Sequence, residues 1–300
     1  MSGSVVYASM SIYSRRTLGP ALITGVVLVC AVALTAQSQA GAEGLADLPG
    51  VRLWFTDSGG AGAAVVFVHA ATGSSRVWEY QRPAFSARGY RVITYDRRGY
   101  GRSVADPSGA QPGTGADDLN ALMDHLKIDR FHLVGTAAGG FVAWDYALSF
   151  PRRLRSLVVA NSIGGVQDPE YQETLRLLRT PEFLAMPPDM RELGPSYRAS
   201  NPGGAKRWRE LEQTARPASA QPPAQTFRNR VTFALLETIA VPTLLLTGDA
   251  DMYAPPPIMR MFAARVKGSQ AVVVPEAGHS AYWEQPEIFN RTVLDFIAKH

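Results

Sequence analysis

The chain has 300 residues, of which 46% are hydrophobic and 19% are charged, which indicates a globular protein with enough apolar side chains for a large core. Its formal charge of +4 becomes +2 without Arg15 and Arg16, and no cluster of basic residues is interleaved with aromatic ones. Nucleic-acid binding is therefore not expected.

Residues 1–40 differ in composition from the rest of the chain. They contain no acidic residue, place Arg15 and Arg16 ahead of an apolar run over residues 18–35, and end in small and polar residues up to Ala40. This order is typical of a secretory signal peptide cleaved near Ala40. We therefore expect an exported protein, periplasmic or secreted, with no membrane segment after signal removal. The alternative is an uncleaved membrane anchor, because about 17 apolar residues is the lower limit for spanning a bilayer.

The same segment bears on the export route and on redox chemistry. Residues 14–18 weakly resemble a twin-arginine export signal, but Gly19 stands where a second bulky apolar residue is usual, so the route stays open. The one cysteine, Cys30, lies in the apolar run, which leaves the mature chain without a disulfide or a thiol nucleophile. We expect neither a metal nor a cofactor, because the histidines outside the motifs below have no partners at metal-ligand spacing: His125, His132 and His300.

From Val51 onward, short apolar runs rich in β-branched residues alternate with longer amphipathic stretches. The runs cover residues 64–68, 90–95, 131–134, 157–160, 243–247 and 271–274. Nearly continuous apolar strands are what a parallel sheet covered on both faces requires. Between them, residues 117–126 place apolar side chains at helical spacing. The alternation predicts an α/β fold with a doubly wound, mostly parallel sheet over residues 45–300.

The alternation breaks between about residues 163 and 238, where prolines separate short helical patches. The stretch is too rich in apolar side chains for a linker, with Leu175, Phe183 and Trp208 among them. It therefore predicts a helical cap inserted over the strand ends. A long surface loop is the alternative.

Four stretches with reactive or glycine residues follow one another along the chain. Residues 67–71 and 95–103 each end a predicted strand, and residues 133–140 lie between a strand and a helix. The fourth stretch combines residues 248–251 with the pair 278–279. In this order and spacing they resemble the α/β-hydrolase fold family, and the resemblance covers nearly all of the chain after residue 51.

The third stretch corresponds to the turn that carries the nucleophile in that family. The family pattern is Gly-x-nucleophile-x-Gly, followed along the chain by the acid and then the histidine. Gly135 and Gly139 retain the turn, which places Ala137 at the nucleophile position. The resemblance implies that the amide of Ala138 helps to form the oxyanion hole, and we expect the amide of Ala71 as the second donor. Because a methyl group cannot attack a carbonyl, an acyl-enzyme route is closed.

The acid and the histidine follow in the family's order. Asp251 fits the G-x-x-D-x-x-x-P pattern with Gly248 and Pro255, so the resemblance implies that Asp251 rather than Asp249 is the acid. His279 follows a predicted strand, as the family's catalytic histidine does.

The surroundings of this pair suggest what the site binds. The aromatic residues Tyr253 and Trp283 lie near the acid and the histidine in sequence and predict an apolar pocket for a small-molecule substrate or ligand. We expect His69 to shape the oxyanion loop, where Ala70 replaces the family's usual glycine, and Asp96 to be structural.

Other hydroxyl groups are alternative nucleophiles. Thr136 precedes Ala137, but a shift by one residue would require Val134 to take a glycine's role. Ser74, Ser75 and Ser162 would have to reach the site from loops.

Three functions follow from an alanine at the nucleophile position. The preferred one is a hydrolase or lyase for a small, largely apolar ester, lactone or similar carbonyl substrate, in which His279, oriented by Asp251, acts as a general base. The second is a non-catalytic, ligand-binding member of the fold. The third is a serine-to-alanine variant of an ordinary serine esterase.

Overall fold

The computed structural model describes residues 41–105, 113–216 and 226–300. The chain divides into residues 1–36 and 37–300, and every described residue belongs to the second unit. The expected signal peptide and Cys30 lie outside the described residues. Within the described ranges, no helix is both long enough and apolar enough to cross a membrane.

The described strands form one nine-stranded sheet in the order β1-β2-β4-β3-β6-β7-β8-β9, with β5 paired to β2. The strands are β1 (Ala42–Leu48), β2 (Val51–Asp57), β3 (Ala64–Val68), β4 (Arg91–Tyr95), β5 (Val104–Ala105), β6 (Phe131–Thr136), β7 (Leu154–Ala160), β8 (Thr243–Gly248) and β9 (Gln270–Val274). From β4 to β9 neighbouring strands are parallel, whereas β1 and β2 add an antiparallel edge. The predicted α/β fold with a mostly parallel sheet is confirmed.

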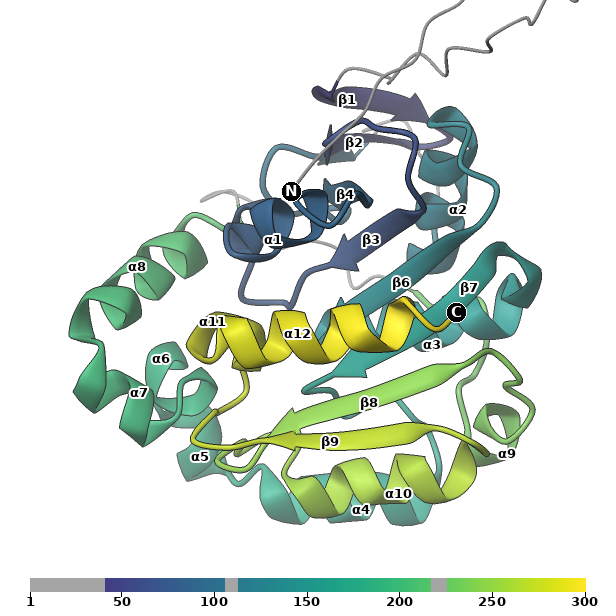
Figure 1. Cartoon of the computed structure of the whole chain (residues 1–300). Coiled ribbons are helices and arrows are strands. Elements are labelled where there is room, and N and C mark those ends of the chain that lie inside the picture. The colour runs from purple at the N-terminus through teal and green to yellow at the C-terminus, as the bar shows by residue number, and fades with distance from the viewer. Residues whose placement is uncertain (1–40, 106–112, 217–225) are drawn as a thin grey trace, which may run out of the picture. The chain divides into compact units, whose positions relative to one another are not determined.

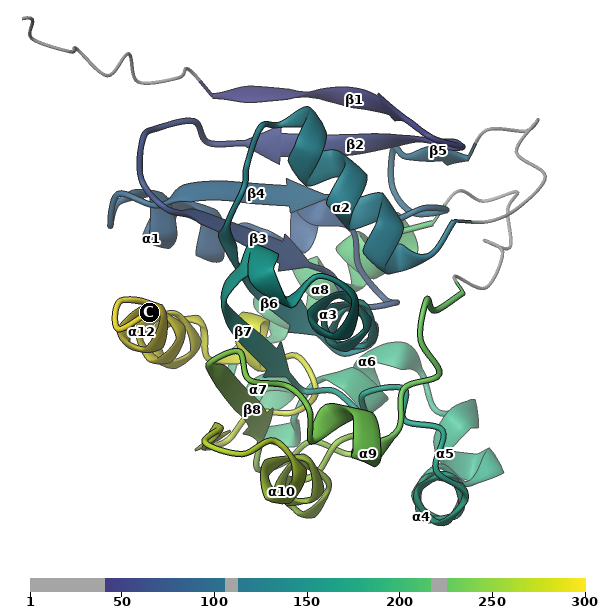
Figure 2. The same ribbon diagram turned by 90° about the vertical axis from the view of Figure 1, so that its right-hand side faces the viewer.

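The central strands are apolar because both faces of the sheet are covered. In β3, Val65 and Phe67 belong to one hydrophobic cluster, and Ala64, Val66 and Val68 belong to the other. Figure 2 shows that helices gather on the two faces: α1 (Gln81–Ser86) and α12 (Pro286–Ile297) on one, and α2 (Gly115–His125), α3 (Ala138–Ser149) and α10 (Pro256–Arg265) on the other. Successive side chains of a strand point to opposite faces, so the central strands β3, β4, β6, β7 and β8 each supply both clusters.

The described residues between β7 and β8 form a series of short helices. They are α4 (Pro169–Leu178), α5 (Pro181–Ala185), α6 (Pro188–Glu192), α7 (Pro195–Ser200), α8 (Pro202–Gln213) and α9 (Phe233–Leu236). The first five each begin at a proline, because the first helical position needs no N–H donor and suits the fixed φ of proline. Five of the prolines in the described part of this stretch are therefore helix starts.

This insertion lies beyond the carboxyl ends of the parallel strands, where Figure 1 shows α5 to α8 past the arrowheads of β3 and β8. Its apolar side chains Leu193, Tyr197, Trp208 and Leu211 join the hydrophobic cluster that also contains residues of α12. The predicted helical insertion is therefore present, and it is packed onto the core at the end of the sheet where α/β proteins bind ligands.

Candidate active site

Ala137 stands in the tight turn between β6 and α3. Its φ of 49° and ψ of −116° lie in a region that few residues other than glycine adopt. The Ala137 amide donates to the carbonyl of Ala160 at 3.0 Å, and the Ala137 carbonyl accepts from the Gly140 amide at 3.0 Å and the Ser162 hydroxyl at 2.7 Å. These bonds hold a backbone conformation that costs about 1–3 kcal/mol, which is typical of functional sites.

The glycines of this turn are required by close backbone approach. A Cβ on Gly139 would lie 2.1 Å from the carbonyl oxygen of Val68, and a Cβ on Gly135 would lie 2.5 Å from the carbonyl oxygen of Gly139. The start of α3 therefore packs directly against β3 and β6, as the strained turn of the sequence motif requires.

We expect Gly139→Ala to destabilise the protein by at least about 1–3 kcal/mol, because the new methyl group would overlap backbone atoms that cannot move aside. Gly44→Ala is the matched control, since a Cβ on Gly44 has nothing within 4 Å. Urea unfolding of both variants measures the difference, and equal stability of the two would contradict this account of the turn.

Two backbone amides, of Ala71 and Ala138, are the expected donors of an oxyanion hole, and this role stays a prediction. Ala138 is the first residue of α3, where N–H groups have no intrahelical acceptor and the helix dipole favours negative charge. Ala71 follows the buried His69, whose Nδ1 lies 2.7 Å from the carbonyl of Ala70 and whose Nε2 accepts the amide of Arg97 at 2.9 Å. Through these two contacts His69 joins the loop after β3 to the loop after β4. Burial and the nearby charge of Arg97 lower the pKa of His69 well below its usual value, so it stays neutral.

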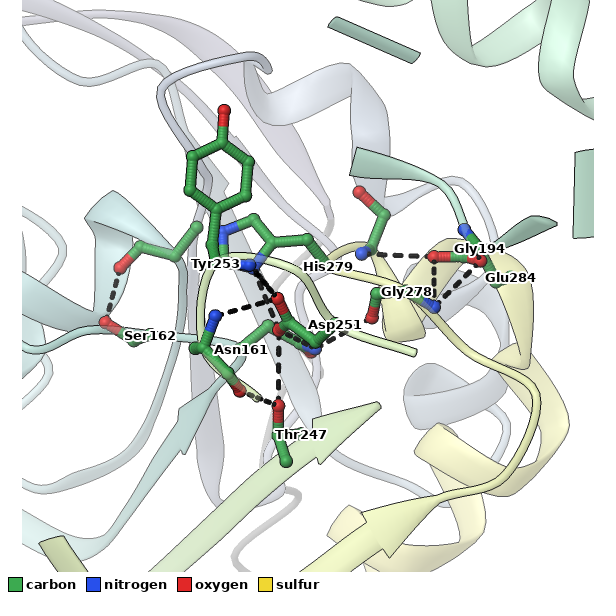
Figure 3. Close-up of polar contacts among 12 residues, drawn as sticks. Asn161, Ser162, Gly194, Thr247, Asp251, Tyr253, Gly278, His279 and Glu284 are labelled. Atoms are coloured by element: carbon green, nitrogen blue, oxygen red, sulfur yellow. Dashed lines mark hydrogen bonds and ion pairs between the residues drawn. The ribbon is translucent and has the colours of Figure 1, made fainter. Parts of the chain in front are cut away.

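His279 and Asp251 form a buried pair (Figure 3). Nδ1 of His279 lies 2.9 Å from both carboxylate oxygens of Asp251. Oδ1 of Asp251 also accepts the amides of Tyr253 and Ala254, each at 2.8 Å. The carboxylate is therefore fixed by backbone donors on the loop after β8, and it orients the imidazole with Nε2 directed away from the carboxylate.

Two polar side chains complete the support of Asp251. Nδ2 of Asn161 donates to Oδ2 at 3.0 Å and to the carbonyl of Gly278 at 3.1 Å. The hydroxyl of Thr247 donates to the carbonyl of Ala254 at 2.6 Å and lies 3.2 Å from Oδ2. Asn161 has a φ of 47°, a conformation that asparagine tolerates better than most residues. The sequence reasoning missed both residues. An asparagine directly after the predicted strand 157–160 was the one available signal for Asn161.

Residues 160–162, at the end of β7, connect the turn to the pair. The carbonyl of Ala160 accepts the amide of Ala137, Asn161 bonds Asp251, and Ser162 bonds the carbonyl of Ala137. One three-residue segment thus contacts both the nucleophile position and the acid, so the two lie in the same site.

The protonation states follow from burial and charge. Burial opposes a charge on His279, but the carboxylates of Asp251, Glu192 and Glu284 and the bond to Asp251 outweigh it and raise the pKa of His279 to about 9. Burial opposes the charge of Asp251 as well, yet the His279 imidazolium and the hydrogen bonds to the carboxylate lower the pKa of Asp251.

A second carboxylate joins the histidine loop to the insertion. Glu284, on α11 (Ala281–Glu284), accepts the amides of Gly194 at 2.7 Å, Gly278 at 3.0 Å and Ser280 at 3.2 Å (Figure 3). Burial raises the pKa of Glu284 to about 7, against the opposing effect of these three donors. The backbone on both sides of His279 is therefore tied to the residue that precedes α7.

The two aromatic residues predicted to bind substrate lie in different places. The ring of Tyr253 lies 4.5 Å from that of His279 and 4.8 Å from that of Phe183 in the insertion. Trp283 is buried and its Nε1 donates to the carbonyl of Gly204 at 3.3 Å, so it joins α11 to α8. Tyr253 is beside the histidine, whereas Trp283 contacts the insertion. Their roles in substrate binding stay predictions.

The alternative nucleophiles have other contacts. Ser74 accepts the amide of Arg76, the amide of Ser75 donates to Asp96, and Ser162 donates to the carbonyl of Ala137. Thr136 is fully buried. In the part of the chain that the structure describes, no serine or threonine hydroxyl is hydrogen-bonded to His279.

The comparisons with known proteins agree with this geometry. A family model described as the α/β hydrolase fold matches residues 63–286. The chain belongs to the α/β-hydrolase fold family. It is similar to a 2-hydroxy-6-oxononadienedioate/2-hydroxy-6-oxononatrienedioate hydrolase of Paraburkholderia xenovorans, with 28% identity over 83% of this chain and 91% of the relative.

Two further proteins extend the comparison. A 2-hydroxy-6-oxo-6-phenylhexa-2,4-dienoate hydrolase of Burkholderia cepacia is 30% identical over 84% of this chain and 93% of the relative. Among solved structures, a thermophilic esterase from Thermogutta terrifontis matches with a TM-score of 0.72 and 28% identity, over 85% of this chain and 98% of the esterase. The relatives are thus hydrolases of the α/β-hydrolase fold.

Proposed function

We propose that this α/β-hydrolase-fold protein is a hydrolase or lyase for a small, largely apolar ester, lactone or similar carbonyl compound, and that it works by general-base catalysis without a nucleophilic serine. One observation carries the proposal. The Asp251–His279 pair keeps its full set of hydrogen bonds beside a strained turn whose nucleophile position is Ala137. A protein that only binds a ligand has no need of so fully supported a base.

In this mechanism Nε2 of His279 takes a proton from water or from the substrate, because Nδ1 is engaged by Asp251. The water oxygen attacks the carbonyl carbon, and the amides of Ala71 and Ala138 bind the developing oxyanion. General-base catalysis contributes about 10²–10⁴ in rate. Each oxyanion donor adds about 3–4 kcal/mol of transition-state stabilisation.

The names of the relatives support hydrolysis over lyase chemistry. Two of them are hydrolases of 2-hydroxy-6-oxo compounds and the third is an esterase. All three names refer to hydrolysis. Hydrolysis of a carbonyl compound needs a base and an oxyanion hole, which fits the groups retained here.

The proposal is tested by assaying aryl esters and lactones with the wild-type protein in a stopped-flow instrument. We expect steady turnover with no initial burst of product, because no acyl-enzyme accumulates. A stoichiometric burst, or an acyl adduct detected by mass spectrometry, would contradict it. A tight ligand that is recovered chemically unchanged would instead favour the binding role.

The rate is expected to rise with pH. The pKa of His279 is raised from 6.5 to about 9, so its imidazole stays protonated to higher pH and the base form grows as the pH approaches 9. The measurement is kcat/KM for 4-nitrophenyl butyrate from about pH 5 to about pH 10, with buffer hydrolysis subtracted. Asp251→Asn removes the nearest carboxylate and should move the rise to lower pH. A rate that is independent of pH would exclude His279 as the base.

We also propose that the protein is exported, on the composition of residues 1–40. Expression of the full chain in a bacterial host followed by cell fractionation and N-terminal sequencing tests this. We expect a mature chain outside the cytoplasm that begins near residue 41. An intact N-terminus in the membrane fraction would indicate an anchor instead.

A further inference from the structure

A cavity at the opposite edge of the sheet from Ala137 takes no part in the mechanism above. Its volume is about 700 Å³, and it lies among the amino ends of β6, β7 and β8, the end of α3 and the residues after α12. Figure 1 shows the end of α12, marked C, away from the arrowheads of β3 and β8. Because a strand rises about 3.3 Å per residue, β6 separates Arg130 from Ala137 by about 20 Å. The cavity is therefore distinct from the candidate active site.

The titratable side chains that line this cavity are all basic. They belong to Arg130, Arg152, Arg155, Lys299 and His300. A second cavity, of about 430 Å³, shares Arg130 and Arg155 with the first, so the two adjoin at these arginines. The second cavity adds Lys127, one acid, Asp129, and Arg91, whose guanidinium is paired with Asp57. Positive charge is thus greatest where the two cavities meet the first one's basic wall.

These basic side chains lack anionic partners. Within residues 41–105, 113–216 and 226–300, none of the five that line the first cavity forms an ion pair. Arg153, which lies between two of them in sequence, is different, since it bonds the carboxylate of Asp124 and the carbonyl of Ile128, each at 2.7 Å. The fold therefore satisfies one arginine of this segment and leaves its neighbours available.

Arg130 and Arg155 have few other contacts. Arg130 donates to the carbonyl of Leu154 at 3.3 Å. Arg155 is partly buried, and its Nε has neither accessible surface nor a hydrogen-bond partner among the described residues. A charged group that has lost part of its hydration without gaining a partner interacts more strongly with an incoming anion than a fully hydrated one does.

The effect of these charges is visible at His132, on β6. The Nδ1 of His132 lies 2.8 Å from the hydroxyl of Ser156. Burial and the positive charges of Arg155, His300 and Arg130 lower the pKa of His132 to about 4. The three basic side chains therefore converge on one point at the start of the sheet.

Most of the remaining wall of the larger cavity is apolar. Leu154 and Ile239 are buried, and Leu148, Val241 and Pro242 also line the cavity. Sites for small molecules are typically cavities of about 300–1,000 Å³ that combine apolar walls with a few charged groups. An anionic head and an apolar body match these two kinds of wall.

We propose that this cavity binds a small organic anion with a carboxylate head and an apolar chain or ring. The carboxylate accepts hydrogen bonds from the guanidinium groups of Arg130 and Arg155, whose planar geometry suits two parallel bonds to one carboxylate. Arg152 and Lys299 add positive charge, and the apolar body lies against the wall formed by Leu154 and its neighbours.

The first experiment varies the ligand. Isothermal titration calorimetry of the full-length protein compares octanoate, which has both parts, with 1-octanol, which lacks the charge, and with inorganic phosphate, which lacks the apolar body. We expect saturable binding of octanoate and at least about tenfold weaker binding of the other two. Equal affinity for octanol would show that the basic side chains are not used and would overturn the proposal.

The second experiment varies the protein. Arg130→Gln/Arg155→Gln should raise the Kd for octanoate by about tenfold or more, and Arg152→Gln/Lys299→Gln, at two exposed positions, by about threefold or more. Arg260→Gln, at an exposed position on α10, is the control and should leave Kd unchanged. Thermal unfolding checks that each variant is folded, and the exposed pair decides the result if the first pair is not.

An octanoate affinity that is the same in the wild type and in both double variants would mean that octanoate binds elsewhere, and would overturn the proposal. The measurements need no turnover. Their outcome is therefore independent of whether the protein hydrolyses esters or lactones.

Discussion

Ala137→Ser is expected to create a covalent nucleophile. The turn keeps its strained φ, the Asp251–His279 pair is in place, and the amides of Ala71 and Ala138 are retained. Loss of the nucleophile costs subtilisin about 10⁶ in kcat, so even partial recovery should raise aryl-ester turnover by about 10²-fold or more. Labelling by a fluorophosphonate, measured by mass spectrometry, should occur at residue 137 of the variant and not in the wild type.

The double variant Ala137→Ser/His279→Ala is the control for this experiment, because a serine without its base should lose the labelling. Absence of labelling in Ala137→Ser, together with loss of the wild-type turnover, would contradict the expectation. That result would mean that the space beside Ala137 serves the water or the substrate and that a hydroxyl obstructs it.

His279→Ala is expected to reduce kcat of the wild-type protein by about 10²–10⁴-fold on any substrate that it turns over, because the base bonded to Asp251 is removed. KM should change little, since Nε2 acts on a proton that moves in the transition state. Steady-state kinetics on the best substrate of the ester and lactone panel measures both constants.

The matched control is His125→Ala, which removes an exposed histidine at the end of α2. It should leave turnover unchanged. If His279→Ala and His125→Ala behaved alike, the base would have to be sought elsewhere and the proposed mechanism would be wrong.

Much of the fold could be predicted because the pattern of apolar residues that marks a buried strand spans only a few consecutive positions. The six apolar runs correspond to β3, β4, β6, β7, β8 and β9. The first five are buried on both faces and must be apolar throughout, whereas β9 is an edge strand that is mostly exposed. The antiparallel edge strands β1 and β2 were not among them. Only Ala46 of β1 is fully buried, so this strand carries no continuous apolar run.

The site could be predicted only where a motif spans a few residues. Gly135, Ala137 and Gly139 share one turn, and their spacing alone indicates it. Asn161 bonds Asp251 across 90 residues of chain, and Glu284 bonds Gly194 across another 90. No local pattern specifies such contacts, because they depend on how distant loops meet at the carboxyl edge of the sheet.

Glu192 is the clearest example of a residue whose place no local sequence pattern predicts. In the sequence it is one acid among several in an irregular, proline-rich stretch, and nothing in its neighbours marks it. Only the packing of residues 192–194 against residues 278–280 brings Glu192 beside the loop that carries His279. The role of a residue in such an insertion depends on the surface against which the insertion packs.

The carboxylate of Glu284 constrains how a ligand enters the protein. It bonds Gly194 at the start of α7 and, at the same time, the amides on both sides of His279. An opening motion that lifted residues 192–194 would break a buried, charge-assisted bond and release the backbone that positions the imidazole. A ligand should therefore enter through parts of the insertion remote from Glu284, so that His279 keeps its position while the site opens.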